Sequence, residues 1–158
     1  MSEPSRQQKL ATVRRSIVAP TFRHPDRVQE AFDILSGNVF PRQTQLSLNL
    51  GPQPFLSYEG LFPVVIQNKK YYFPILFLLS ADFPESPPSV SIVPTLDMYI
   101  VSHPNVASDG TVSLPSLTHW DSSSSIEAVL LEMSSSFSTR SPLVCFLSYS
   151  MKSLHLQS

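Results

Sequence analysis

The sequence predicts an α+β fold in which a four-stranded antiparallel meander packs against helices from the N-terminal and C-terminal parts of the chain. Apolar residues recur at helical spacing near both ends, and short apolar runs separated by turn residues lie between them. The chain has 158 residues, 42% of them hydrophobic, which suits one compact domain. We expect this domain over residues 1–146, followed by a tail or short helix over residues 147–158.

Two helices are expected before residue 40. The first is marked by apolar residues on one helical face, namely Leu10, Val13 and Ile17. The second is marked by apolar residues at spacings of three and four, namely Val28, Ala31, Phe32 and Leu35. Pro25 suits the first turn of this second helix, and Gly37 suits its end.

Strands are expected next, because the hydrophobic period changes. Leu46, Leu48 and Leu50 alternate with polar residues, which predicts a strand with one buried face that ends before Pro52. The further strand candidates are residues 55–58, 61–67, 71–79 and 89–93. Residues 67–70 have turn composition and are expected to close a hairpin, which completes an antiparallel meander.

Residues 94–121 show no sustained period and contain prolines and a glycine, so we expect a long ordered loop of the kind that often carries function. The clearest helix follows, with apolar residues at Ile126, Val129, Leu130, Met133 and Phe137. Serines at 122–125 can cap its N-terminus. This helix is expected to cover one face of the sheet.

Composition excludes several classes of function. The formal net charge is −1 and the basic residues are scattered, so no nucleic-acid partner is expected. Cys145 is the only cysteine, which excludes an internal disulfide and a thiolate metal cluster and suits a reducing compartment. The longest apolar stretch, residues 73–79, is far shorter than the roughly 20 residues of a membrane helix. We expect a cytoplasmic protein without cofactor or metal, with no direct membrane insertion.

Short motifs follow one another from the third strand candidate onward. They are Tyr71-Tyr72-Phe73-Pro74-Ile75, Pro84-Glu85-Ser86-Pro87-Pro88, His103-Pro104-Asn105 and Ser113-Leu114-Pro115, with Trp120 after them. Their order and spacing resemble the ubiquitin-conjugating-enzyme fold over about residues 5–145. The resemblance implies this fold for most of the chain.

In active members of that fold, the catalytic cysteine lies eight residues after the asparagine of the His-Pro-Asn motif. That position here is occupied by Ser113, counted from Asn105. A thioester requires sulfur, and a serine hydroxyl needs a neighbouring base to react at neutral pH. Cys145 lies too far along the chain to replace the missing nucleophile. The chain therefore resembles the inactive ubiquitin E2 variant (UEV) domains, and we expect no catalytic residue.

Among these variants, the chain is similar to the UEV domain of the ESCRT-I subunit family of the tumour-susceptibility type. The similarity is carried by Tyr71 to Ile75, by Val93-Pro94-Thr95 with Met98, by Leu114-Pro115 with Leu117, His119 and Trp120, and by Ser141-Pro142-Leu143-Val144. The alternative is an inactive cofactor subunit of a conjugating-enzyme heterodimer, which the chain resembles only in residues 84–88.

The ESCRT-I resemblance implies a non-catalytic adaptor that is recruited to endosomes and sorts ubiquitinated cargo into multivesicular bodies. Its ligands would be short P-[T/S]-A-P-like peptides, whose preformed extended backbone loses little entropy on docking. The groove residues carried over by position are Leu61, Ile66, Tyr71, Met98, Pro142, Val144 and Cys145. Ile66 replaces a family tyrosine and Cys145 a family phenylalanine, so we expect an altered motif preference or a lower affinity.

Ubiquitin is a second ligand that the resemblance implies, through an extended hairpin and a phenylalanine. Here the hairpin, residues 41–57, is expected to be longer than in the family, and Ser91 stands in place of the phenylalanine. Leu46 and Leu48 are candidates for a different apolar contact. Other ESCRT-I subunits are expected to bind through regions outside these residues.

Two local interpretations compete with the resemblance. Ser113, His103 or His119, and Asp109 have the residue types of a serine hydrolase, although no G-x-S-x-G turn surrounds the serine. Tyr71 has the residue type of a core aromatic. Trp120 is interpreted as structural, with its indole N–H bound to a backbone acceptor.

Overall fold

The structure is a computed structural model that describes residues 5–41 and 47–145 of the chain. The expected tail over residues 147–158 lies outside the described residues, so the proposed domain boundary stays a prediction. None of the described helices is long and apolar enough to cross a membrane.

The first two helices are confirmed, as α1 (Arg6–Arg15) and α2 (Pro25–Asn38). Ile17, which was expected on the face of the first helix, lies beyond the end of α1 but is buried in the core. A capping box starts α1, because the Gln8 N–H donates to the Ser5 hydroxyl and the Ser5 N–H donates back to the Gln8 side chain. Pro25 occupies the first turn of α2 as expected, and the four predicted apolar residues of α2 are buried. The Arg14 guanidinium forms two hydrogen bonds to the Asp33 carboxylate, at 2.8 and 2.9 Å, and so joins the two helices.

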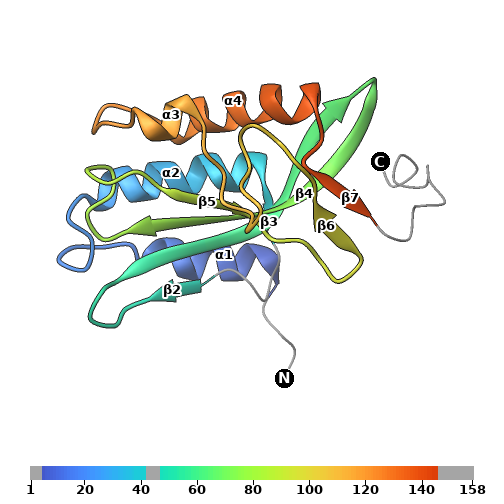
Figure 1. Cartoon of the computed structure of the whole chain (residues 1–158). Helices are drawn as coiled ribbons and strands as arrows, with labels where there is room; N and C mark the ends of the chain where they lie inside the picture. Colours follow the sequence, from blue (N-terminus) through green and yellow to red (C-terminus); the bar gives the residue numbers. More distant parts are fainter. Residues whose placement is uncertain (1–4, 42–46, 146–158) are drawn as a thin grey trace.

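The meander is confirmed with more strands than expected. The main sheet contains β1 (Phe40–Pro41), β2 (Ser47–Asn49), β3 (Phe55–Ile66), β4 (Lys69–Ser80) and β5 (Ser89–Ile92). Its antiparallel order is β1-β3-β4-β5, with β2 also paired to β3 (Figure 1). The β3–β4 hairpin closes at Gln67 and Asn68, both with positive φ, as a two-residue primed turn requires.

Residues 55–58 and 61–67 form one strand rather than two, which corrects the sequence prediction. Gly60 does not break β3. Instead it lets β1 approach, because a Cβ there would collide with the Phe40 carbonyl oxygen. The alternating leucines are also only partly as predicted: Leu48 packs against the core, but β2 ends at Asn49 and Leu50 is exposed.

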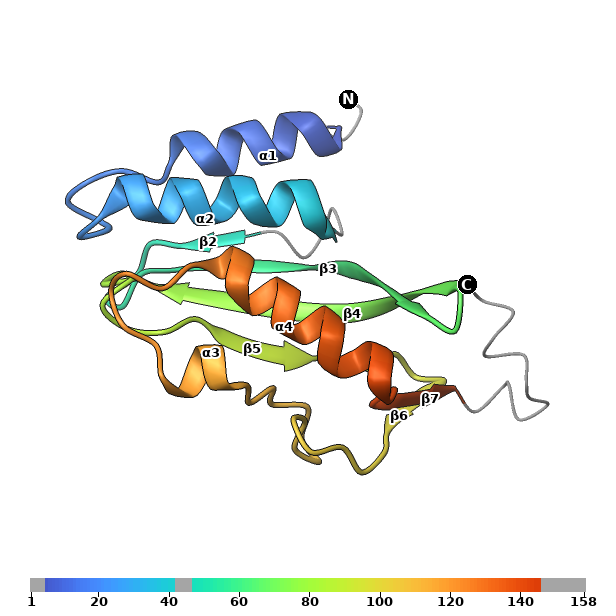
Figure 2. The ribbon, with the colours of Figure 1, turned by 90° about the horizontal axis from the view of Figure 1, so that it is seen from above.

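Helix α4 (Ile126–Thr139) lies beside α2 and across one face of the sheet (Figure 2). All five apolar residues predicted for it are buried. Two ring contacts show how the layers interlock, with Phe73 of β4 against Phe137 of α4 and Phe32 of α2 against Tyr58 of β3. The core therefore lies between the helices and this face.

The long loop predicted over residues 94–121 contains regular structure, which is a second correction. β6 (Met98–Ile100) pairs with β7 (Leu143–Cys145) in a separate two-stranded sheet, and α3 (Pro115–Thr118) is a single helical turn. Three-residue strands are too short to give a hydrophobic period, so the sequence did not signal them.

Candidate functional site

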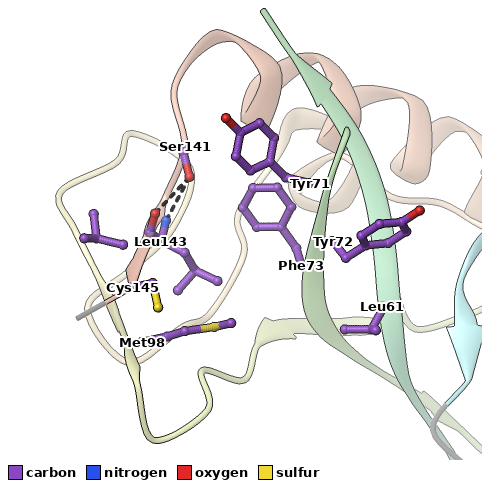
Figure 3. A pocket seen from close by; sticks show the side chains of 9 residues that line it. Leu61, Tyr71, Tyr72, Phe73, Met98, Ser141, Leu143 and Cys145 are labelled. Carbon is purple, nitrogen blue, oxygen red and sulfur yellow. Dashed lines mark hydrogen bonds between the residues drawn. The ribbon is translucent and has the colours of Figure 1, made fainter. Parts of the chain in front are cut away.

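The main groove forms where β4 extends beyond its neighbour. β5 pairs with β4 only from Ile75 onward, so the segment from Tyr71 to Phe73 lies past the end of β5. There the β6–β7 sheet lies opposite β4, and a groove of about 250 Å³ separates them (Figure 3). The groove is lined by Leu61, Tyr71, Tyr72, Phe73, Met98, Ser141, Leu143, Val144 and Cys145.

Backbone pairing fixes the wall opposite β4. Met98 and Cys145 are direct cross-strand partners, so both side chains lie on the same side of the β6–β7 sheet. The Val101 N–H donates to the Pro142 carbonyl at 2.9 Å and extends this pairing by one step. The Ser141 hydroxyl bonds both the N–H and the carbonyl of Leu143, which holds the start of β7 in place.

The structure brings five of the seven expected peptide-binding residues together in this groove: Leu61, Tyr71, Met98, Val144 and Cys145. Ile66 and Pro142 do not line it. Ile66 ends β3 beside the hairpin turn and packs against the core, whereas Pro142 is buried directly before the strand that forms the wall.

Four lining residues were missed by sequence reasoning. They are Tyr72, Phe73, Ser141 and Leu143. Each lies within a few positions of an expected peptide-binding residue. This closeness in the sequence was the signal that could have identified them as groove residues. Tyr72 is 40% exposed and its ring contacts that of Phe40, which is 51% exposed, so an aromatic pair continues from the groove onto the surface.

The groove is apolar, and none of its lining residues carries a charge. The nearby Asp97 carboxylate accepts hydrogen bonds from the Thr95 hydroxyl and, at 3.3 Å, from the thiol of the buried Cys145. The Thr95 hydroxyl is the larger cause, and together these donors lower the pKa of Asp97. A short apolar slot with one polar group at its edge suits an extended peptide better than a charged metabolite.

A second hollow, of about 520 Å³, adjoins the His-Pro-Asn segment. The Asn105 amide there is bound at both ends. Its Nδ2 donates to the Ser113 carbonyl at 3.0 Å, and its Oδ1 accepts from the Ser136 hydroxyl at 2.6 Å. Asn105 thus orders the polypeptide around its own loop.

The geometry of the described residues does not support the hydrolase interpretation. Nε2 of His103 lies 2.9 Å from the Arg140 carbonyl and Nδ1 accepts from the Asn105 N–H, so backbone groups occupy both ring nitrogens. Asp109 accepts from the Thr111 N–H. Among the described residues, no hydrogen bond joins the Ser113 hydroxyl to His103, whose two ring nitrogens face backbone groups.

Trp120 is structural, as expected, because its indole N–H donates to the Pro84 carbonyl at 2.8 Å. The structure does not bring the residues named for ubiquitin binding together on an exposed apolar surface. Leu46 lies outside the described residues, and Leu48 packs against the core. Ser91 is half-buried in β5, where it pairs with Leu76. Neither Leu48 nor Ser91 presents an exposed apolar side chain.

The sheet and helix arrangement resembles that of conjugating enzymes, and a groove lies beside it. These features define the class of ubiquitin E2 variants, which are catalytically inactive. The family model of the UEV domain matches residues 41–145, and the chain belongs to this family.

Curated relatives agree with this assignment. The chain is 33% identical over 119 residues to ubiquitin-conjugating enzyme E2 variant 3 of Danio rerio, a match that covers 75% of this chain and 25% of that protein. It is 31% identical over 70 residues to the ESCRT-I complex subunit tsg101 of Dictyostelium discoideum, covering 44% of this chain and 15% of that protein. The chain therefore spans a quarter or less of these relatives.

Solved structures share the fold. The UEV domain of yeast Vps23 in complex with a Vps27 PSDP peptide superposes with a TM-score of 0.61 at 17% identity, covering 85% of this chain and 94% of that one. A complex of the Vps23 UEV domain with ubiquitin superposes with a TM-score of 0.57 at 19% identity, covering 83% of this chain and 94% of that one.

Proposed function

We propose that this chain is a non-catalytic adaptor domain of the ESCRT-I type, which binds short P-[T/S]-A-P-like peptides in the groove between β4 and the β6–β7 sheet. The observation that carries the proposal is the convergence of Tyr71, Met98 and Val144 on one apolar slot. These three come from separate parts of the sequence, and the family resemblance names all of them as peptide contacts.

The physical character of the slot supports a proline-containing ligand. Proline-rich segments dock with a preformed extended backbone against aromatic and apolar walls, and Tyr71, Tyr72 and Phe73 supply such a wall. The proline-containing PSDP peptide bound by the yeast Vps23 domain is of the same kind. Because Ile66 lies away from the slot and Cys145 is small, we expect an affinity in the range of about tens of micromolar, raised by avidity in an assembly.

The proposal includes the absence of catalysis. By the resemblance, Ser113 occupies the position of the lost cysteine, and its hydroxyl has no base beside it within the described residues. Incubation with activated ubiquitin, followed by intact-mass spectrometry, should therefore give no oxyester at Ser113.

Ubiquitin is proposed as a second ligand, on the support of the Vps23 complex with ubiquitin. The positions of Leu48 and Ser91 argue for a contact different from that of the family. Action at endosomes and assembly with other ESCRT-I subunits are part of the proposal and rest on the resemblance to the tsg101 subunit.

The test is an NMR titration of isotope-labelled protein with a P-T-A-P peptide. We expect shifts around Tyr71, Met98 and Val144, and their loss in Tyr71→Ala. Tyr99→Ala is the matched control, because Tyr99 neighbours Met98 in β6 and does not line the groove. An absence of shifts at millimolar peptide would overturn peptide binding. Stable heterodimer formation with a conjugating enzyme would then favour the cofactor-subunit alternative.

A further inference from the structure

Asp97 stands at one end of the groove. It lies in the turn that leads into β6, directly before the lining residue Met98. Its Oδ2 is 3.3 Å from Sγ of Cys145, a second lining residue, and its side chain is partly exposed. If one residue of a peptide is bound in the groove beside Cys145, a long side chain on the next peptide residue can therefore reach the Asp97 carboxylate.

Asp97 has no cationic partner in the described part of the protein. Its hydrogen-bond donors, the Thr95 hydroxyl and the Cys145 thiol, are both neutral. The ion pairs found among residues 5–41 and 47–145 are Arg14–Asp33, Arg23–Glu85, His24–Glu85 and Arg27–Glu30, and none includes Asp97. Its charge is thus free to act on a ligand.

The charges at the two ends of the groove differ in sign. In Figure 3, Tyr71 and Ser141 lie at one end and Met98 and Cys145 at the other. The first end is flanked in the chain by exposed Lys70 and Arg140. Among the described residues, the second end is flanked by Asp97. A ligand in this slot therefore meets negative charge at the Cys145 end.

We propose that Asp97 makes the groove select peptide motifs that carry a lysine or arginine beside the proline-containing core, on the side that lies at Cys145. This inference rests on the proposed peptide-binding function and adds a specificity-determining residue to it. An ion pair at a partly exposed site changes affinity by about twofold to fivefold and weakens as salt rises.

The experiment measures dissociation constants for four labelled peptides, with lysine or glutamine placed either before or after the same P-T-A-P core. One lysine peptide should bind about twofold to fivefold more tightly than its glutamine partner, and high salt should remove the difference. Asp97→Asn should abolish the preference while retaining binding of the glutamine peptides. An asparagine oxygen still accepts a hydrogen bond from Thr95 or Cys145, and an unchanged thermal unfolding midpoint verifies that the variant is folded.

Asp26→Asn is the matched control, because it removes the same charge at the start of α2, remote from β6 and β7 (Figure 2). It should keep the lysine preference. Equal affinities for lysine and glutamine peptides, or a preference that survives in Asp97→Asn, would overturn the inference and leave peptide binding intact. Failure of all four peptides to bind would overturn the proposed function and this inference with it.

Discussion

The side chain of Asn105 joins the Ser113 backbone to Ser136 of α4, with hydrogen bonds of 3.0 and 2.6 Å. Asn105 and Ser136, which are 31 residues apart in the sequence, are thereby tied together. In this protein both ends of the Asn105 amide form hydrogen bonds within the fold. This relationship gives the asparagine of the His-Pro-Asn motif a structural role in the fold.

Asn105→Ala should therefore lower the free energy of unfolding, by about 1 kcal/mol, because it removes both hydrogen bonds and leaves the partly buried Ser136 hydroxyl without this acceptor. Urea denaturation measures the loss. Peptide affinity should not change, since Asn105 does not line the main groove. Asn38→Ala, which removes one exposed hydrogen bond at the end of α2, should cost less. Equal losses in both variants would contradict a structural role for Asn105.

Phe137 provides a test of the layer packing. It is fully buried, with its ring against Phe73 and edge-on to His103. Phe137→Ala should destabilise the fold by about 3–5 kcal/mol through lost burial and a cavity. Leu131→Ala on the same helix should change stability by less than about 0.5 kcal/mol, because Leu131 is 69% exposed. Similar denaturation midpoints for the two variants would refute this core.

Acid stability should depend on Asp82. The Ser80 hydroxyl donates to its carboxylate at 2.6 Å and the Ser86 hydroxyl at 2.9 Å, and these donors lower its pKa below the ordinary 3.8. The unfolded chain thus takes up the proton first as pH falls. The stabilisation from the ionised Asp82 carboxylate is complete above its ordinary pKa. It is lost as pH falls through the lowered pKa that Asp82 has in the folded protein.

Asp82→Asn should accordingly flatten the decline of stability below about pH 4, measured by urea denaturation at a series of pH values. The double variant Ser80→Ala with Ser86→Ala removes the donors and keeps the carboxylate. It should flatten the same region. A decline as steep as that of the unaltered protein in both variants would rule out these hydrogen bonds as its source.

The sequence predicted α4 completely, because five apolar residues at helical spacing demand one buried face and all five are buried. Five of the seven residues that the family motifs named for peptide binding also line one groove, among them Tyr71 and Met98, and their role in binding stays a prediction. The groove residues that the sequence did not predict are brought to the groove by tertiary contacts. Leu143 enters the groove wall only because β7 pairs with β6, a contact between distant three-residue strands that leaves no local pattern.

Asp97 is a similar case. As a single acidic residue in a loop it has no motif around it, and its significance arises from the 3.3 Å contact with Cys145. Because Cys145 replaces an aromatic wall, an altered motif preference or a lower affinity is expected. The structure adds that a carboxylate lies within hydrogen-bond distance of its thiol.

Gly60 and Gly37 should respond oppositely to the same substitution. A Cβ at Gly60 would collide with the Phe40 carbonyl, so Gly60→Ala must displace β1 from β3 and should cost about 1–3 kcal/mol. Gly37 lies in α2, and no neighbouring atom comes within 4 Å of the place that a Cβ would occupy. Gly37→Ala should therefore stabilise the protein by about 0.5 kcal/mol through helix propensity.

Thermal unfolding of both glycine variants measures the contrast between them. Because the two variants add the same methyl group, any general effect of a larger side chain is common to both. A neutral Gly60→Ala would contradict the requirement for glycine where β1 approaches β3. A destabilised Gly37→Ala would contradict the open space beside Gly37.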